Sequence, residues 1–187
     1  MMATIRQGKQ KALLVVDVQV GVMQDAWDAP SVIKNINLAV EKARKQGIPV
    51  IWVQHADEEL VYNSPEWQLV PELSPAEDEV RIHKRYNSSF EDTSLEETFA
   101  AMGVTHLVLS GAATNACIRA TAYGALDRGD DLTLIDDAHT TNSIELKNGT
   151  RIEADKIILE LNIAMNWLSY PGRTNGTASA KDVNFVG

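Results

Sequence analysis

Short, continuously apolar runs alternate along this chain with stretches in which apolar residues recur at helical spacing. The runs have the length and composition of buried strands. We place predicted strands at residues 11–17, 49–54, 79–84, 106–110 and 132–135. The segments between them predict helices, so the chain consists of repeated strand–helix units.

Helix boundaries are indicated by capping residues and by the spacing of apolar positions. The helix after the first strand has one apolar face, formed by Ile33, Ile36, Val40 and Ala43. The next helix has a capping-box start at Ser94 and Glu97 and stops at Gly103. The last helix begins near Ala154, and its apolar face is formed by Ile157, Leu161, Met165 and Leu168. Residues 147–149 predict a compact hairpin just before it.

Repeated strand–helix units predict an α/β fold with three layers, a mainly parallel sheet and right-handed crossovers. We expect a single domain over residues 1–187, with its core at about 11–170 and a polar tail at 173–187. Within that tail only Val183, Phe185 and Val186 are large and apolar. The tail is therefore expected to be either frayed or docked on a partner subunit.

Composition narrows the class of protein. The 187 residues are 44% hydrophobic, which suits one sizeable core, and the net charge of −9 disfavours binding to nucleic acid. No apolar run approaches the ~20 residues of a membrane span, and the first ten residues lack the apolar region of a signal peptide. With a single cysteine and no internal disulfide, the protein is expected in the cytoplasm.

That cysteine, Cys117, follows the fourth predicted strand, where a turn leads into a helix. A thiol in the first turn of a helix lies near unpaired N–H groups and the positive end of the helix dipole. Both influences favour the thiolate and lower the thiol pKa toward neutral. A lone cysteine is otherwise most often buried core.

Two further reactive side chains follow other predicted strands. Asp17 ends the first strand, where a buried carboxylate is costly unless it is paired or functional. Lys84 ends the third strand, although a lysine alone is usually solvated. In an open parallel sheet, all three side chains would gather at one edge, where ligands bind.

These segments carry a family resemblance. Residues 13–19 (LLVVDVQ), the Lys84 segment, residues 111–122 (GAATNACIRATA) and residues 136–141 (DDAHTT) resemble, in this order, the isochorismatase-like cysteine hydrolases. That superfamily includes nicotinamidases, carbamoylases and other amidohydrolases. The resemblance runs from about residue 11 to 139 and implies a six-stranded sheet of order 3-2-1-4-5-6.

The resemblance also implies roles for individual residues. Asp17, Lys84 and Cys117 would be the catalytic triad of an amidohydrolase that forms a thioester. The Ala112–Ala113 peptide bond would be cis, and the backbone N–H groups of Ala113 and Cys117 would form the oxyanion hole. A carbamoyl or ureido hydrolase with the same triad, and a non-catalytic binding or scaffold protein, remain as alternatives.

No cofactor is expected. Nicotinamidases of this superfamily carry an Asp-x-His pair and a further histidine after the second strand, where they bind a metal. This chain has His55-Ala56-Asp57 instead, so we expect those residues to orient a loop and no zinc or iron to bind.

The expected partner is a small-molecule amide together with other copies of the chain, as a homo-oligomer (dimer or tetramer) whose interface includes residues after Ala154. Its apolar surface would come from the last helix and residues 183–186. Proximity in sequence and the resemblance suggest the substrate pocket residues, although core packing is as good an account of the aromatic ones. These are Gln19, Trp67, Tyr86, Phe90, Asn115, Tyr123 and His139.

Overall fold

Six parallel strands form the central sheet of the computed structural model, which describes residues 7–185. In spatial order β3-β2-β1-β4-β5-β8, the strands are Val80–Lys84, Val50–His55, Gln10–Val16, Val104–Ala112, Asp131–Thr140 and Asn175–Ala178. This is the order 3-2-1-4-5-6 that the family resemblance implied, and the three-layer α/β/α class is confirmed.

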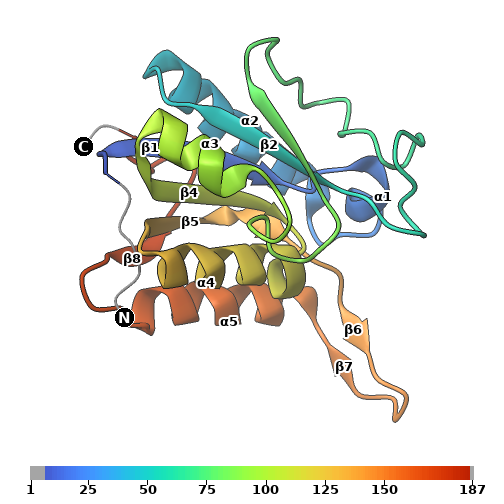
Figure 1. Cartoon of the computed structure of the whole chain (residues 1–187). Coiled ribbons are helices and arrows are strands. Elements are labelled where there is room, and N and C mark those ends of the chain that lie inside the picture. The colour runs from blue at the N-terminus through green and yellow to red at the C-terminus, as the bar shows by residue number, and fades with distance from the viewer. Residues whose placement is uncertain (1–6, 186–187) are drawn as a thin grey trace.

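Helices cover both faces of the sheet (Figure 1). One face is covered by α2 (Ala29–Lys45), and the other by α3 (Leu95–Met102), α4 (Arg119–Arg128) and α5 (Ala154–Trp167). The short α1 (Val20–Met23) follows β1. Alternate residues of each strand serve the two cores; in β1, Leu14 packs on the α3–α5 side and Leu13 on the α2 side. No helix in the described part of the chain is long and apolar enough to cross a membrane.

The C-terminal segment differs from the expectation of a polar tail that is frayed or docked on a partner. It supplies β8, the sixth strand, and then packs on the α2 side of its own sheet. Val183 and Phe185 are buried in this core at 2% and 1% exposure, and Lys42 Nζ donates hydrogen bonds to the backbone oxygens of Ala180, Lys181 and Val183. Val186 lies outside the described residues.

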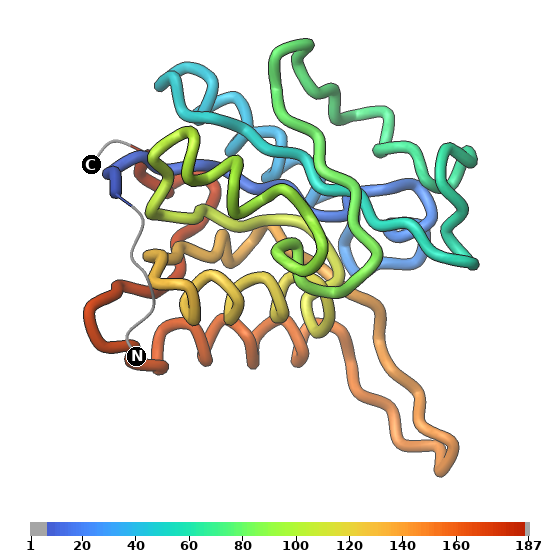
Figure 2. Tube along the Cα trace, viewed as in Figure 1, coloured from blue at the N-terminus to red at the C-terminus, as the bar shows by residue number. Residues whose placement is uncertain are grey.

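Several local boundaries also differ from the sequence prediction. The Ser94 side chain makes no capping hydrogen bond; the hydroxyl of Thr93 accepts one from the backbone N–H of Leu95 instead. β5 continues to Thr140, well beyond the predicted end, after an irregularity in its pairing with β4. The predicted hairpin is present as β6 (Ile144–Glu145) and β7 (Arg151–Ile152), which form an arm projecting from the body (Figure 1). The long segment between β2 and β3 has no helix or strand and runs along the outside of the molecule from the end of β2 to the start of β3 (Figure 2).

Candidate active site

The structure brings Asp17, Lys84 and Cys117 together at the carboxyl edge of the sheet. Asp17 directly follows β1, Lys84 is the last residue of β3, and Cys117 lies in a π-helical turn, η1 (Thr114–Ile118), between β4 and α4. Lys84 Nζ is 2.7 Å from Asp17 Oδ2 and 3.2 Å from Cys117 Sγ. Asp17 and Lys84 are 1% and 2% exposed, and Cys117 is 9% exposed. Of the three, the sulfur-bearing residue is therefore the one most open to solvent.

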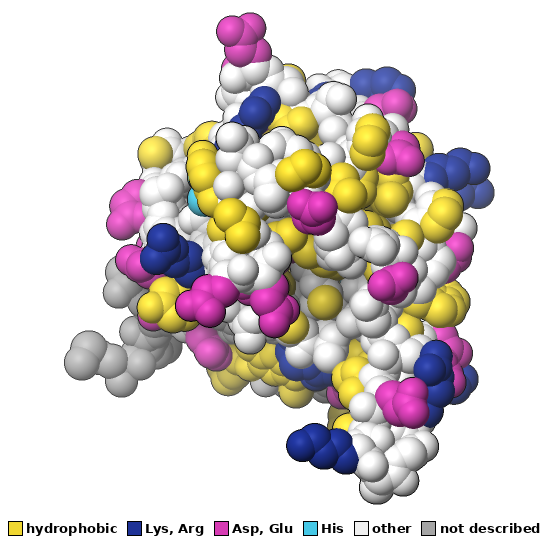
Figure 3. All heavy atoms as spheres, turned by 90° about the vertical axis from the view of Figure 1, so that its right-hand side faces the viewer, with side chains coloured by type: hydrophobic (Ala, Val, Ile, Leu, Met, Phe, Trp, Pro, Cys, Tyr) yellow, Lys and Arg dark blue, Asp and Glu magenta, His cyan; other side chains and the backbone are white. Residues whose placement is uncertain are grey.

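Figure 3 looks onto this edge of the molecule, with the arm at its lower right. Hydrophobic side chains lie in a small recess near the centre of the view, and acidic and basic side chains are scattered around it. A small molecule approaching the sheet edge therefore meets a surface of mixed polarity.

The backbone conformation at the ends of β1 and β4 positions Asp17 and the turn that carries Cys117. Asp17 has φ 53°, a left-handed conformation that is uncommon outside glycine and turns the chain out of the strand. Beside it, Gly111 has φ 122°, and a Cβ there would lie 2.0 Å from the backbone oxygen of Val16. Only glycine permits this close approach of β4 to β1. The Ala112–Ala113 peptide bond that follows is cis.

Burial controls the electrostatics of the site. It raises the pKa of Asp17, against the lowering effect of the Lys84 charge. Burial and the neighbouring Asp17 carboxylate raise the pKa of the Cys117 thiol to about 12, although Lys84 acts in the opposite direction. The sequence-based expectation of a near-neutral thiol pKa is therefore wrong. Desolvation and the Asp17 charge together outweigh the Lys84 charge, so Cys117 rests as a thiol and needs a base.

Further residues that the sequence did not assign to the site surround the triad. Lys84 Nζ also donates a hydrogen bond to the backbone oxygen of Tyr86, at 3.1 Å, and lies 3.3 Å from His55 Nδ1. Asn87 Oδ1 lies 4.0 Å from Cys117 Sγ. His55 ends β2 and Asn87 follows β3. Their positions after strands were therefore the pattern that could have identified them.

Three of the predicted pocket residues serve the framework instead. Gln19 is fully buried; its Nε2 donates to the backbone oxygens of His55 and Trp67, and its Oε1 accepts from the His55 N–H. Trp67 packs against His83, with ring centroids 5.1 Å apart. Because His83 and Lys84 are consecutive in β3, they face opposite sides of the sheet, and Trp67 lies on the side away from Cys117.

Phe90 is the third. It is 5% exposed and belongs to the core, with its ring 5.8 Å from that of Phe99 and 4.7 Å from the Arg128 guanidinium. For Phe90, the alternative of core packing was the correct one.

The other four candidates lie in mixed surroundings. Tyr86 is 52% exposed, and its backbone oxygen accepts the hydrogen bond from Lys84 Nζ. Asn115 is exposed two residues from Cys117, and its Oδ1 accepts a hydrogen bond from Thr141. Tyr123 is partly buried against the core. These three positions stay predictions for the substrate pocket.

His139 is a buried support for the nucleophile turn. Its Nδ1 lies 2.9 Å from the Thr114 hydroxyl and its Nε2 lies 2.8 Å from Asn162 Oδ1. Burial lowers the pKa of His139 to about 4, so the ring is neutral near pH 7. His139 therefore joins η1 to α5 rather than acting as an acid.

No group of three or more His, Cys, Asp or Glu side chains that could hold a metal is found among residues 7–185. His55 Nε2 and Asp57 Oδ2 are 3.1 Å apart, and Asp57 Oδ1 accepts the backbone N–H groups of Glu59 and Leu60. Asp57 thus orients the loop after β2, as its sequence position predicted.

The chain is similar to known proteins over most of its length. The family model for the isochorismatase domain matches residues 11–153. The chain is 32% identical over 156 residues to YrdC, an uncharacterized isochorismatase family protein of Bacillus subtilis, covering 80% of this chain and 83% of YrdC. It is 30% identical to the ureidoacrylate amidohydrolase RutB of Klebsiella pneumoniae, covering 60% of this chain and 66% of RutB.

Among solved structures, an isochorismatase (PP1826) from Pseudomonas putida superimposes with a TM-score of 0.83 at 25% identity, covering 95% of this chain and 93% of the other. The structural similarity therefore extends beyond residues 11–153, which the family model matches.

Proposed function

This chain belongs to the isochorismatase family and is a hydrolase acting on carbon–nitrogen bonds; from that premise we propose that it cleaves a small-molecule amide with Cys117 as nucleophile. One observation carries the proposal. A buried lysine ammonium lies within 2.7 Å of a buried carboxylate oxygen and 3.2 Å of the thiol sulfur. A thiol whose pKa is raised to about 12 is a poor nucleophile alone, and the adjacent Asp17 is the base that activates it.

The reaction begins when Asp17 removes the proton from Cys117 Sγ. Sγ then bonds to the amide carbon, and the carbonyl electrons move onto oxygen. The backbone N–H groups of Ala113 and Cys117 hold that oxyanion, each such donor being worth about 3–4 kcal/mol in the transition state. The C–N bond breaks as the amine nitrogen takes the proton from Asp17, which leaves a thioester.

Water completes the cycle. Asp17 takes a proton from water, whose oxygen attacks the thioester carbon. The C–S bond breaks, a carboxylic acid leaves, and the sulfur regains its proton from Asp17. Throughout, the Lys84 side chain stabilises whichever of Asp17 or Cys117 is negative.

A carbamoyl or ureido group is the second candidate substrate. The similarity to RutB, a ureidoacrylate amidohydrolase, favours it, and the same triad would attack a ureido carbon in the same way. Cys117 must stay a free thiol for this chemistry, which suits a reducing compartment, so we place the enzyme in the cytoplasm.

The test is a screen of primary amides and ureido compounds for ammonia release, run on the wild type and on Cys117→Ser. We expect turnover in the wild type and none above background in the variant, because an aspartate near pH 7 does not appreciably ionise a serine hydroxyl. Mass spectrometry should trap an acyl adduct on Cys117. Turnover by Cys117→Ser would refute the cysteine mechanism, and an inert wild type across the whole screen would favour the scaffold alternative.

We also propose a homo-oligomer in which a second copy covers α5. Leu159, Ile163 and Trp167 lie one turn apart on its outer face and are 51%, 55% and 85% exposed. The arm that leads into α5 exposes Leu146 and Ile152, and a hairpin this short is marginal without a partner.

This surface replaces the one expected from residues 183–186, since Val183 and Phe185 are buried in their own chain. Light scattering at micromolar concentration should give a multiple of the 20.5 kDa chain mass for the wild type and a smaller particle for Trp167→Glu. A monomeric wild type would refute this assembly.

A further inference from the structure

His55 is the neighbour of Lys84 to which the triad chemistry gives no role. It is the last residue of β2, which pairs with β3 so that His55 and Lys84 are in register. His55 Nδ1 lies 3.3 Å from Lys84 Nζ, and His55 Nε2 lies 3.1 Å from Asp57 Oδ2. Asp57, His55 and Lys84 are therefore connected by successive contacts, and Lys84 is the member that belongs to the triad.

Asp57 fixes the proton on the His55 ring. Hydrogen bonds from the backbone N–H of Leu60 lower the pKa of Asp57, so it is a carboxylate that only accepts. Its Oδ1 is taken by the N–H groups of Glu59 and Leu60, at 2.9 and 2.7 Å, and its Oδ2 faces His55 Nε2. The ring must then carry its proton on Nε2, which leaves Nδ1 as an acceptor for Lys84.

Lys84 has more acceptors around it than protons to give. Its ammonium carries three donors, while Asp17 Oδ2, the Tyr86 oxygen, Cys117 Sγ and His55 Nδ1 lie at 2.7, 3.1, 3.2 and 3.3 Å. The contact with His55 is the longest. His55 Nδ1 is therefore one of four acceptors that share the three protons of the ammonium.

We propose that His55, oriented by Asp57, is a positioning residue that holds the Lys84 ammonium between Asp17 and Cys117. The inference deepens the proposed function, because it concerns how the same triad is kept ready. A four-carbon side chain has many rotamers, and a lateral acceptor reduces the number that Lys84 populates. His55 acts through Lys84 and touches neither the sulfur nor the amide.

The test measures alkylation of Cys117 by iodoacetamide, which needs no substrate. Near pH 8 we expect His55→Ala to react roughly tenfold more slowly than the wild type, since Lys84 then drifts from the sulfur it helps to ionise. His55→Asn places an amide oxygen close to the position of Nδ1 and should recover the rate to within about threefold.

Asp57→Asn tests the tautomer. Its Oδ1 would stay bound to the two loop N–H groups, so its NH2 would face His55 and move the ring proton to Nδ1. An N–H would then point at the ammonium. We expect alkylation at least as slow as in His55→Ala, in the manner known for a histidine held in the wrong tautomer.

A double-mutant cycle separates positioning from mere structure. In a Lys84→Met background, which keeps the side-chain length without the charge, His55→Ala should change the alkylation rate less than about twofold. His83→Ala is the matched control, because it removes a neighbouring histidine on the opposite face of the sheet and should leave the rate unchanged.

Three outcomes would each overturn the proposal. The alkylation rate could be unchanged or faster in His55→Ala, it could fail to recover in His55→Asn, or His55→Ala could have an equal effect in the wild-type and Lys84→Met backgrounds. The outcome is independent of the amide screen. If Cys117→Ser retained turnover, the hydrolase mechanism would fail while the alkylation cycle still reported how Lys84 is held.

Discussion

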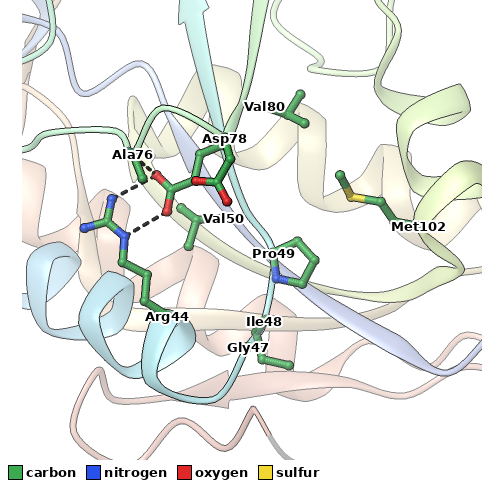
Figure 4. A pocket seen from close by; sticks show the side chains of 10 residues that line it. Arg44, Gly47, Ile48, Pro49, Val50, Ala76, Asp78, Val80 and Met102 are labelled. Atoms are coloured by element: carbon green, nitrogen blue, oxygen red, sulfur yellow. Dashed lines mark hydrogen bonds and ion pairs between the residues drawn. The ribbon is translucent and has the colours of Figure 1, made fainter.

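Two carboxylates paired with cations lie at opposite ends of the parallel strands, and their pKa values are shifted in opposite directions. Glu79, just before β3, is held by Arg44 Nε and Nη2 at 2.8 Å each, by Trp52 Nε1 at 2.7 Å and by the Ala76 N–H at 2.8 Å. Figure 4 shows Arg44 and Ala76 at the cavity beside this carboxylate. Burial acts to raise the pKa of Glu79, but these hydrogen bonds outweigh it and lower that pKa. Asp17 has the Lys84 ammonium and the Cys117 thiol, and its pKa is raised.

The difference lies in the number of donors. Glu79 borders a cavity of about 380 Å³ that is lined by Arg44, Pro49, Met102 and others, yet its oxygens are already satisfied. Glu79 therefore has a structural role, and both of its oxygens are occupied by donors. Asp17 is fully buried with few donors, in a left-handed backbone conformation, so its carboxylate can take up a proton. A cavity beside a charged pair is thus a poorer indicator of an active site than an under-solvated carboxylate beside a nucleophile.

The largest effect is expected from Asp17→Asn, which removes the base and keeps the shape. Asparagine tolerates the left-handed conformation, so the turn should persist. Turnover should fall by about two to four orders of magnitude, the usual worth of a general base. Alkylation of Cys117 near neutral pH should become faster, because Asp17 raises the thiol pKa and Lys84 lowers it.

This pair of results is diagnostic, since the variant would have a more ionised nucleophile and less activity. The thiolate would also replace the lost carboxylate as counter-ion for Lys84, limiting the loss of stability. Retained turnover would contradict the role of Asp17 as base. Slower alkylation would contradict the claim that the Asp17 charge raises the pKa of the Cys117 thiol.

A smaller and opposite effect is expected from Glu79→Gln. Turnover should be unchanged, and the free energy of unfolding at pH 7 should fall by roughly 1–2 kcal/mol, between the values for exposed and buried charged pairs. Because the folded-state pKa of Glu79 lies below its usual 4.5, its stabilisation is present above that pH. It is lost as the pH falls through the lower folded-state value.

Urea unfolding of wild type and variant near pH 7 and near pH 3 measures this difference. The gap between the two proteins should narrow at the lower pH. A gap that is constant with pH, or a loss of turnover in Glu79→Gln, would mean that the two carboxylates differ less than their surroundings indicate.

Much of the fold follows from the sequence because its strands are uninterrupted apolar runs and its helices carry one apolar face. β8 escaped prediction because Asn175–Ala178 is an edge strand with no large apolar residue. The packing of Val183 and Phe185 depends on a surface provided by α2 and the sheet, which no local pattern encodes.

Position after a strand predicted which residues would gather at the site, but not their environment. The pKa of Cys117 depends on desolvation, which a tertiary arrangement sets and a motif does not. Gln19 and Phe90 resembled pocket residues because sequence proximity cannot distinguish a side chain that faces a pocket from one that braces the backbone or fills the core. His55 was missed as a triad neighbour because its contact with Lys84 crosses from one strand to the next.

The smallest expected effect sharpens the comparison from the Asp17 side. Removing metals should leave turnover unchanged, because the ammonium of Lys84 already occupies the position beside His55 Nδ1, at 3.3 Å, that a cation would need. Asp57 spends one oxygen on the loop N–H groups, so the His55–Asp57 pair offers too few free donors for a tetrahedral site. Dialysis against EDTA, followed by metal analysis and the ammonia assay, checks this. Activity lost in EDTA and restored by zinc would show that a metal, rather than Lys84, supplies the positive charge beside Asp17. The comparison with the Arg44–Glu79 pair would then be between a metal site and a salt bridge.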